Sequence, residues 1–298
     1  MKRINEQMGN SFRKAVTSLT AAAIMVGLAS GSVLAAGEST PPAKTAPPPA
    51  DAAANLAAQA TNPAANLMQF QIQNSYNWDN YNSSGSGNTF VIQPVIPIPL
   101  PWEAVPLVIT RTTIPYVRTP GLDTVGHKNG FGDISFLGLF TPKTGLKGQT
   151  IGLGPTVTFP TAGDNEFTGS GKWQAGPSFL YINHQTSTQW GFFGWQQWSF
   201  ASTSSGKGRP GVNKTSLQPF ITHHFGKGWF VGTPDGPQVY DWKTKEWTLT
   251  LGPQLGRVFK IGKQPVKLFG AVYHNPVDNG GPSAKWTAKI GLTLLFPE

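Results

Sequence analysis

Five histidines are the side chains of this sequence that could most directly serve in catalysis or metal binding. None has HExxH spacing or a carboxylate at a metal-ligand offset, and the chain contains 0 cysteines. His223 and His224 are adjacent, so on a β-strand their rings would point to opposite faces and could not chelate one ion. We therefore predict no metal site and no cofactor. The histidines are His127, His184, His223, His224 and His274.

Other short motifs with chemical meaning are equally weak. The tetrapeptide GSGK (169–172) lacks both the upstream glycine of a phosphate-binding loop and the Ser or Thr that should follow its lysine. No GxSxG nucleophile motif is present. We therefore expect no catalytic residues, and the elements that the sequence builds become the better guide to function.

The composition is that of a β-rich chain with little charge. Only 12% of the residues are charged, about half the usual share. Gly (35) and Pro (26) are abundant, as are Phe (18), Trp (10) and Tyr (6), which favours many short strands with tight turns. The net charge is +9, but the basic residues are scattered. A nucleic-acid partner is not expected, because such binding needs a clustered basic face.

The N-terminal region reads as an export signal followed by a linker. Residues 1–14 are polar and basic, residues 15–34 are uncharged, and small residues flank a cut after Ala35 or Ala36. This is the form of a secretory signal peptide, predicted over 1–35; an uncleaved membrane anchor is the alternative. Residues 36–66 are rich in Ala and Pro. Since they bury little apolar area, we predict a disordered linker, whose Ala-rich part could also form a transient helix.

From residue 67 onward, apolar side chains alternate with polar or small ones, as in LMQFQIQNSYNW (67–78). This period of two predicts strands. We expect twelve of them, most about ten residues long, the length that crosses a bilayer when tilted. The expected strands are 67–77, 88–98, 106–118, 131–141, 150–160, 172–183, 189–200, 213–225, 228–234, 246–258, 265–274 and 285–297.

The connections alternate between long and short. Long polar loops such as 79–87 and 119–130 take turns with short ones such as PKTGLKG (142–148) and GKG (226–228). With the N-terminus in the periplasm, the long loops lie outside, as in bacterial outer-membrane barrels. Such a sheet must close, because every backbone group in hydrocarbon has to be paired. We predict an all-β, antiparallel up-and-down transmembrane β-barrel of about 12 strands over 67–298; a soluble β-sandwich is the alternative.

In such a barrel the apolar phase faces lipid and the polar phase faces an enclosed lumen. Arg111 and Asp133 fall on neighbouring strands, and we expect them to pair across the sheet. The residues expected to line the lumen are Gln69, Gln71, Gln73, Arg111, Asp133, Lys172, Gln174, Gln218, Gln254 and Lys289.

Two further residue types bear on the strands. Trp and Tyr near strand ends, such as Trp78 and Trp286, suit interfacial girdles. Prolines inside the expected strands, such as Pro155, Pro177 and Pro219, cannot donate to the ladder. We therefore expect bulges or bends at these positions.

The stretch 130–297 also shows an almost continuous family resemblance. The blocks that carry it are GFGDISFLGLFTPK (130–143), IGLGPTVTFPTAGD (151–164), GSGKWQAGPSFL (169–180), QQWSFA (196–201), LQPFITHHFGKGWF (217–230), LGPQLGRVFKIGKQPVKL (251–268) and GPSAKWTAKIGLTLLFP (281–297). They resemble the "meta-pathway of phenol degradation"-like transporters of bacterial outer membranes, whose members are often mislabelled neuromedin U. Residues 67–129 match less well. The resemblance implies a barrel for uptake of aromatic or other small hydrophobic compounds.

These patterns predict a porin-like channel of the Gram-negative outer membrane rather than an enzyme. Twelve strands enclose a lumen narrower than that of general porins, which have about 16–18 strands. Its lining of amides, hydroxyls and few charges suits small neutral or hydrophobic solutes. Expected partners are the solute, outer-membrane lipid and lipopolysaccharide, and the barrel-assembly machinery. The alternatives are a structural or surface-binding barrel and, less favoured, a lipid hydrolase that uses His223 near the barrel rim.

Overall fold

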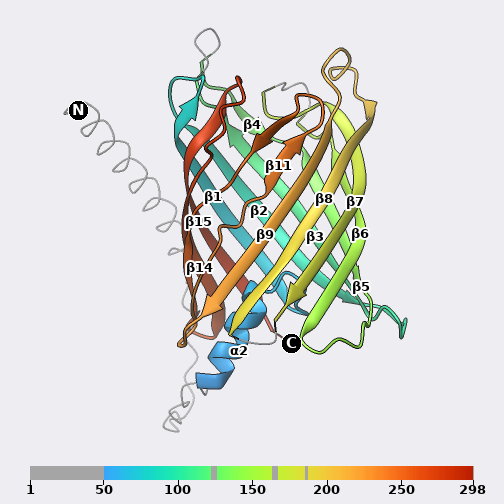
Figure 1. The fold of residues 1–298 in the computed structure, drawn as a ribbon, viewed down its shortest axis with the longest axis vertical. Helices are drawn as coiled ribbons and strands as arrows, with labels where there is room; N and C mark the ends of the chain where they lie inside the picture. Colours follow the sequence, from blue (N-terminus) through green and yellow to red (C-terminus); the bar gives the residue numbers. More distant parts are fainter. Residues whose placement is uncertain (1–49, 122–125, 163–166, 185–186, 298) are drawn as a thin grey trace, which may run out of the picture. The chain divides into compact units, whose positions relative to one another are not determined.

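The computed structural model describes residues 50–121, 126–162, 167–184 and 187–297. In this part of the chain one antiparallel sheet curls into a closed barrel (Figure 1). The strands follow one another around the ring in chain order, and β10 pairs with both β9 and β13, which closes it. The predicted up-and-down antiparallel barrel is confirmed.

The described strands are β1 (Met68–Tyr81), β2 (Gly87–Pro99), β3 (Leu107–Arg118), β4 (Asn129–Phe131), β5 (Ile134–Thr141), β6 (Gln149–Phe159), β7 (Lys172–Asn183), β8 (Thr188–Ser202), β9 (Asn213–His224), β10 (Trp229–Gly232), β11 (Gln238–Asp241), β12 (Glu246–Thr248), β13 (Gln254–Ile261), β14 (Gln264–His274) and β15 (Ser283–Phe296). Three positions of the ring hold two successive segments each: β4 and β5, β10 and β11, and β12 and β13. The described barrel therefore has twelve strands around its circumference, as predicted.

The two ends of the barrel differ. One end, here named the turn end, carries short connections such as Phe225–Gly228, in which Gly226, Lys227 and Gly228 all have positive φ. The other, the loop end, carries longer ones such as 119–128 and 203–212. The loop expected at 79–87 is shorter than predicted, because β1 continues to Tyr81.

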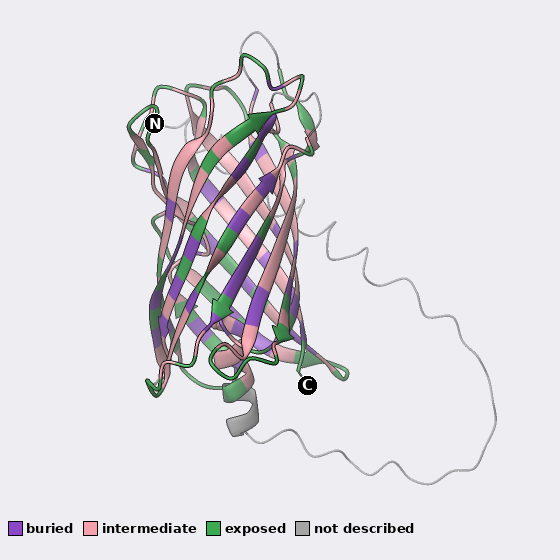
Figure 2. Ribbon diagram, turned by 90° about the vertical axis from the view of Figure 1, so that its right-hand side faces the viewer, coloured by how far each residue is buried: buried purple, intermediate pink, exposed green. Residues whose placement is uncertain are grey.

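Buried residues alternate with more exposed ones along the strands, as the colours of Figure 2 show. In β1, Gln69 and Gln73 are buried while Met68 is exposed. The same alternation holds in β6, where Thr156 and Thr158 are buried and Leu153 is 55% exposed. The outer face is therefore apolar although water-accessible in the isolated chain. Its exposed apolar side chains include Met68, Ile96, Phe136, Leu153, Phe179, Phe192, Ile221, Val231, Leu255 and Leu268.

The inner wall changes character along the barrel axis. Near the loop end it is polar, with residues such as Thr158 and Gln174 buried inside. Toward the turn end it carries two apolar clusters, which the alternation alone did not predict, beside buried polar side chains such as Gln69 and Gln189. One apolar cluster there comprises Ala64, Val95, Ile109, Leu137, Leu139, Leu180, Ile182 and Phe193. A second comprises Ala57, Ala60, Leu67, Phe230, Val258, Phe269 and Leu295.

Helix α2 (Ala50–Thr61) lies at the turn end, near the C-terminal end of the chain (Figure 1). Ala50–Thr61 is part of the linker predicted over 36–66, and it is helical, as the alternative for its Ala-rich part allowed. Alanine favours helix, and burial of Ala57 and Ala60 against the second apolar cluster supplies the tertiary packing that a short helix needs. The signal peptide (1–35) and residues 36–49 lie outside the described residues. Within the described part of the chain, α2 included, no helix has the length and apolar character to cross a membrane.

The expected bulges do not coincide with the prolines. Pro155 lies opposite Pro177, and Pro219 opposite Phe192, in unbroken register. On their other side the same prolines lack a ladder partner: the β5–β6 pairing skips Pro155, the β7–β8 pairing skips Pro177, and neither β10 nor β11 pairs with Pro219. Each residue of a strand in a closed barrel directs its N–H to only one of its two neighbours, so a proline interrupts the ladder on one side without shifting the register. The register shifts between named strands occur instead near Asp79 and between Trp173 and Gln174.

Candidate functional site

The candidate site is the interior of the barrel, where two cavities follow each other along the axis. The cavity nearer the turn end has a volume of about 130 Å³, and the one nearer the loop end about 370 Å³. Both are lined by Gln93, Arg111, Leu137, Gln218 and Asp235. These five residues therefore mark the level at which the two cavities meet.

The sequence-predicted lumen residues lie along these cavities, with the exception of Lys172. Gln69, Gln71, Arg111, Gln218 and Gln254 line the turn-end cavity. The loop-end cavity is lined by Gln73, Arg111, Asp133, Gln174, Gln218 and Lys289. Lys172 is buried at the loop end, where its Nζ donates to Ser202 Oγ and to the carbonyl of Gly206 at 2.8 Å each.

Between β10 and β11 the chain leaves the sheet at residues 233–237, sequence TPDGP. Pro234 and Pro237 have no N–H to give to a ladder, so this position suits an interruption. The segment turns inward: Lys289 Nζ on β15 donates to the carbonyl oxygen of Asp235 at 2.7 Å. In the ring β13 and β14 separate β10 from β15. The segment therefore reaches across part of the interior and narrows it.

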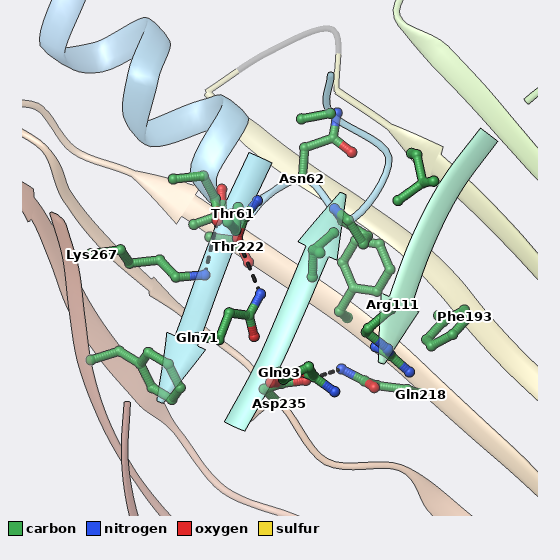
Figure 3. A pocket seen from close by; sticks show the side chains of 18 of the residues that line it. Thr61, Asn62, Gln71, Gln93, Arg111, Phe193, Gln218, Thr222, Asp235 and Lys267 are labelled. Carbon is green, nitrogen blue, oxygen red and sulfur yellow. Dashed lines mark hydrogen bonds between the residues drawn. The ribbon is translucent and has the colours of Figure 1, made fainter. Parts of the chain in front are cut away.

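The Asp235 carboxylate is the centre of a polar network (Figure 3). Gln218 Nε2 donates to its Oδ1 at 2.9 Å, and the Lys289 ammonium lies 3.6 Å from its Oδ2. Gln73 reaches the same Oδ2 at 3.4 Å and donates to Gln71 at 2.9 Å, which in turn donates to Gln69 at 3.1 Å. The glutamines of β1 thus form an amide ladder that ends at Asp235.

Arg111 approaches the same level from the other side. Its guanidinium carbon lies 4.8 Å from the ring centre of Phe193 and 5.9 Å from that of Trp195, both on β8. In the ring β5, β6 and β7 separate β3 from β8, so the arginine side chain extends through the lumen. Figure 3 shows Arg111 beside Phe193 and Gln218, with Asp235 nearby.

The expected Arg111–Asp133 pair is wrong. Asp133 Oδ2 accepts hydrogen bonds from the N–H (2.7 Å) and hydroxyl (2.8 Å) of Ser170 in the adjoining loop. The register places Arg111 opposite Leu137, four residues beyond Asp133, or about 13 Å at the rise of an antiparallel strand. Both side chains do face the loop-end cavity. The prediction that they point into the barrel was therefore correct, but they lie at different heights along the barrel axis.

The last turn of α2 closes the turn-end cavity. Lys267 Nζ donates to the carbonyl of Ala60 at 2.8 Å, where the helix dipole favours a cation. Gln189 Nε2 donates to the carbonyl of Ala58 at 2.9 Å, and Thr61 Oγ1 lies 3.1 Å from His224 Nε2. Figure 3 shows Thr61 and Asn62 at one end of the pocket and Asp235 at the other.

The histidines of β9 face opposite sides, as predicted. His224 points inward to α2, whereas His223 is exposed and its Nδ1 lies 2.8 Å from Thr188 Oγ1. That contact is a single hydroxyl–imidazole pair at the turn end. In the described ranges, no group of three His, Cys, Asp or Glu side chains is placed to hold a metal ion.

Sequence reasoning missed several lumen residues. Asp235 falls in the connection between the expected strands 228–234 and 246–258, so the pattern predicts a loop there, although the Pro-Asp-Gly-Pro run signals a turn that interrupts a strand. Gln93 and Lys267 sit in the expected polar phase of their strands and could have been chosen with their neighbours. Phe193 gave no such signal, because its strand is apolar on both faces near the turn end.

No protein-family model matches this sequence, and no curated protein is similar to it in sequence. Solved structures are similar in fold. The COG4313 outer membrane channel from Pseudomonas putida F1 matches with a TM-score of 0.56 at 14% identity, over 77% of this chain and 94% of that one. The outer membrane phospholipase A from Escherichia coli matches with a TM-score of 0.40 at 12% identity, over 78% of this chain and 96% of that one. The described chain thus shares the β-barrel fold of this outer-membrane protein of Pseudomonas putida; the narrower resemblance to phenol-pathway transporters stays a prediction.

Proposed function

We propose that this protein is an outer-membrane channel that passes small, weakly polar or hydrophobic solutes through its barrel. The observation that carries the proposal is the pair of cavities that meet at Arg111 and Asp235. A barrel built only for support would fill its interior with packed side chains, as small barrels do. Here the interior keeps space on both sides of one narrow level.

The outer face supports a place in a bilayer. Its exposed side chains are mostly apolar, and exposed contiguous apolar surface of this kind marks a membrane or protein contact. Exposed tryptophans occur near both ends, with Trp190 and Trp229 at the turn end and Trp173 and Trp198 at the loop end, as interfacial girdles require. Export by a cleaved signal peptide, insertion by the barrel-assembly machinery and contact with lipopolysaccharide follow as parts of the same proposal.

The solute is small because the passage is narrow and partly filled. The inward segment with Asp235 restricts the middle of the lumen, and α2 restricts the turn end. Both cavities combine apolar side chains with amides. The turn-end cavity has Ile109, Leu139 and Phe193 beside Gln69, Gln71 and Gln254, and the loop-end cavity has Leu137 and Trp195 beside Gln73, Gln174 and Gln197. Such walls suit a solute with a hydrophobic body and one polar group. Aromatic solutes fit this description and agree with the family resemblance.

Liposome swelling tests the proposal. Protein reconstituted from heat-modifiable, folded material should admit small solutes such as glycerol and benzyl alcohol and exclude disaccharides. Fractionation of cells should place the protein with the outer membrane. Swelling no faster than in protein-free liposomes, with the protein still in the outer membrane, would favour a structural or surface-binding barrel instead.

A further inference from the structure

The cavities are lined by charges that do not cancel. Two carboxylates among the described residues line the cavities. One, Asp133, accepts hydrogen bonds from the N–H and hydroxyl of Ser170. The other, Asp235, forms an ion pair with Lys289 and accepts a hydrogen bond from Gln218. Both carboxylates therefore have their oxygens bound to nearby donors, and only Lys289 among the lining cations forms an ion pair.

The remaining two cations differ in their surroundings. Lys267 gives its ammonium to the Ala60 carbonyl at the end of α2. Arg111 has its guanidinium against Phe193 and Trp195, and its Nε is buried without a hydrogen-bond partner in the described structure. Leaving a buried donor without an acceptor is costly. An anion that accepts hydrogen bonds from this guanidinium would therefore be stabilised.

One wall of the space beside Arg111 is apolar, while Gln69, Gln71 and Gln254 line another part of the same cavity. The wall of the turn-end cavity includes Val95, Ile109, Leu137, Leu139, Phe193 and Phe220. Its volume is about 130 Å³, close to the roughly 150 Å³ that suffices to hold benzene in an apolar protein cavity. A guanidinium at the edge of such a space recognises one planar anionic group, because its N–H fork matches a carboxylate.

We propose that the lumen holds a binding site for a small carboxylate with a compact apolar body, its carboxylate on Arg111 and its body against the cavity wall. This assignment deepens the proposed channel function and rests on it for how the ligand arrives. Asp235 at the same level disfavours a second negative charge on the ligand. The site thus selects a monoanion over a dianion, and an apolar acid over a bare anion.

Calorimetry on the purified full chain in detergent tests the site without requiring flux. Benzoate is the probe, benzamide its uncharged counterpart, and acetate the anion without a ring. We expect saturable benzoate binding, at least about tenfold tighter than that of benzamide or acetate, as one charged hydrogen-bonded contact supplies. The variant Arg111→Gln should weaken benzoate binding at least about tenfold. The matched variant Arg118→Gln, exposed at the loop end of the same strand, should bind as the wild type does.

The outcomes separate the site from the channel. Benzoate binding equal to that of benzamide, or unchanged in Arg111→Gln that is still heat-modifiable, overturns the site. If acetate binds as tightly as benzoate, the claim that the cavity wall binds the apolar body of the ligand is overturned. If Arg111→Gln does not fold, the comparison of the three probes on the wild type decides. Binding as expected without solute flux in liposomes would uphold the site and reject the channel, whereas flux without benzoate binding would do the reverse.

Discussion

Lys289 holds Asp235 inside the barrel by two contacts: its Nζ lies 3.6 Å from the carboxylate Oδ2 and donates to the backbone carbonyl at 2.7 Å. The lysine comes from β15, and the aspartate from a segment that left the sheet between β10 and β11. One side chain thus fixes both the charge and the position of the backbone that narrows the lumen. The balance between these residues and Arg111 should decide which ions pass.

Replacing Asp235 by asparagine should make the passage favour anions. The substitution leaves Lys289 and Arg111 without their nearest carboxylate, and a unit charge at about 4 Å in water-like surroundings is worth about 1 kcal/mol. The cation-to-anion permeability ratio, read from the reversal potential in a salt gradient, should fall about fivefold. The control Asp79→Asn removes an exposed carboxylate paired with Lys285 at 3.7 Å and should leave the ratio almost unchanged. Equal cation-to-anion permeability ratios in the two variants would show that Asp235 does not influence the ions that pass.

Phe193 and Phe192 are neighbours on β8 that face opposite ways, with 3% and 42% exposure respectively. Truncating Phe193 to alanine should lower the free energy of unfolding by about 3–5 kcal/mol, because it leaves a cavity in the apolar cluster. Truncating Phe192 should cost clearly less, since detergent or lipid refills the space. Urea unfolding followed by heat-modifiability on gels measures both. A larger loss for Phe192 would mean that the inside and outside of this strand have been exchanged.

An arginine on the outer face tests whether that face meets hydrocarbon. Leu153 is 55% exposed in the middle of β6, and Leu146 is 50% exposed in the turn before it. Leu153→Arg should destabilise the membrane-inserted barrel by about 2–4 kcal/mol, the cost of arginine near a bilayer midplane, and lower the amount assembled in the outer membrane. Leu146→Arg should assemble normally. Normal assembly of both variants would mean that the outer face at Leu153 does not meet hydrocarbon.

The sequence was sufficient for the barrel and for which side chains face inward, because a period of two fixes the face of every residue once one face is assigned. The sequence did not predict how high each side chain lies along the barrel axis. Arg111 and Asp133 share a face but lie at different heights, because the register depends on the turn geometry around the whole ring. The sequence also missed Asp235, whose inward path depends on Lys289, distant in sequence. The sequence indicated no more than a transient helix at α2, because an alanine-rich segment becomes stably helical only when another surface, here Phe230 and its neighbours, covers it.

Helix α2 restricts the turn end of the lumen, so besides the segment with Asp235 it should limit the ion conductance of the barrel. Deleting residues 50–63 removes the helix and opens the turn-end cavity, so conductance should rise severalfold. Deleting residues 37–49 keeps the helix and should leave conductance at the wild-type level. Lys267→Met removes the contact to Ala60 while the helix remains, and it should give brief openings to the larger conductance.

Single-channel recording in planar bilayers tests the central claim most directly, with the wild type and the 50–63 deletion compared side by side. The channel account predicts small, discrete conductance steps from the wild type and larger steps from the deletion, both from protein that is heat-modifiable and therefore folded. Silence from both proteins, at protein amounts at which a known porin conducts, would contradict a route through this barrel.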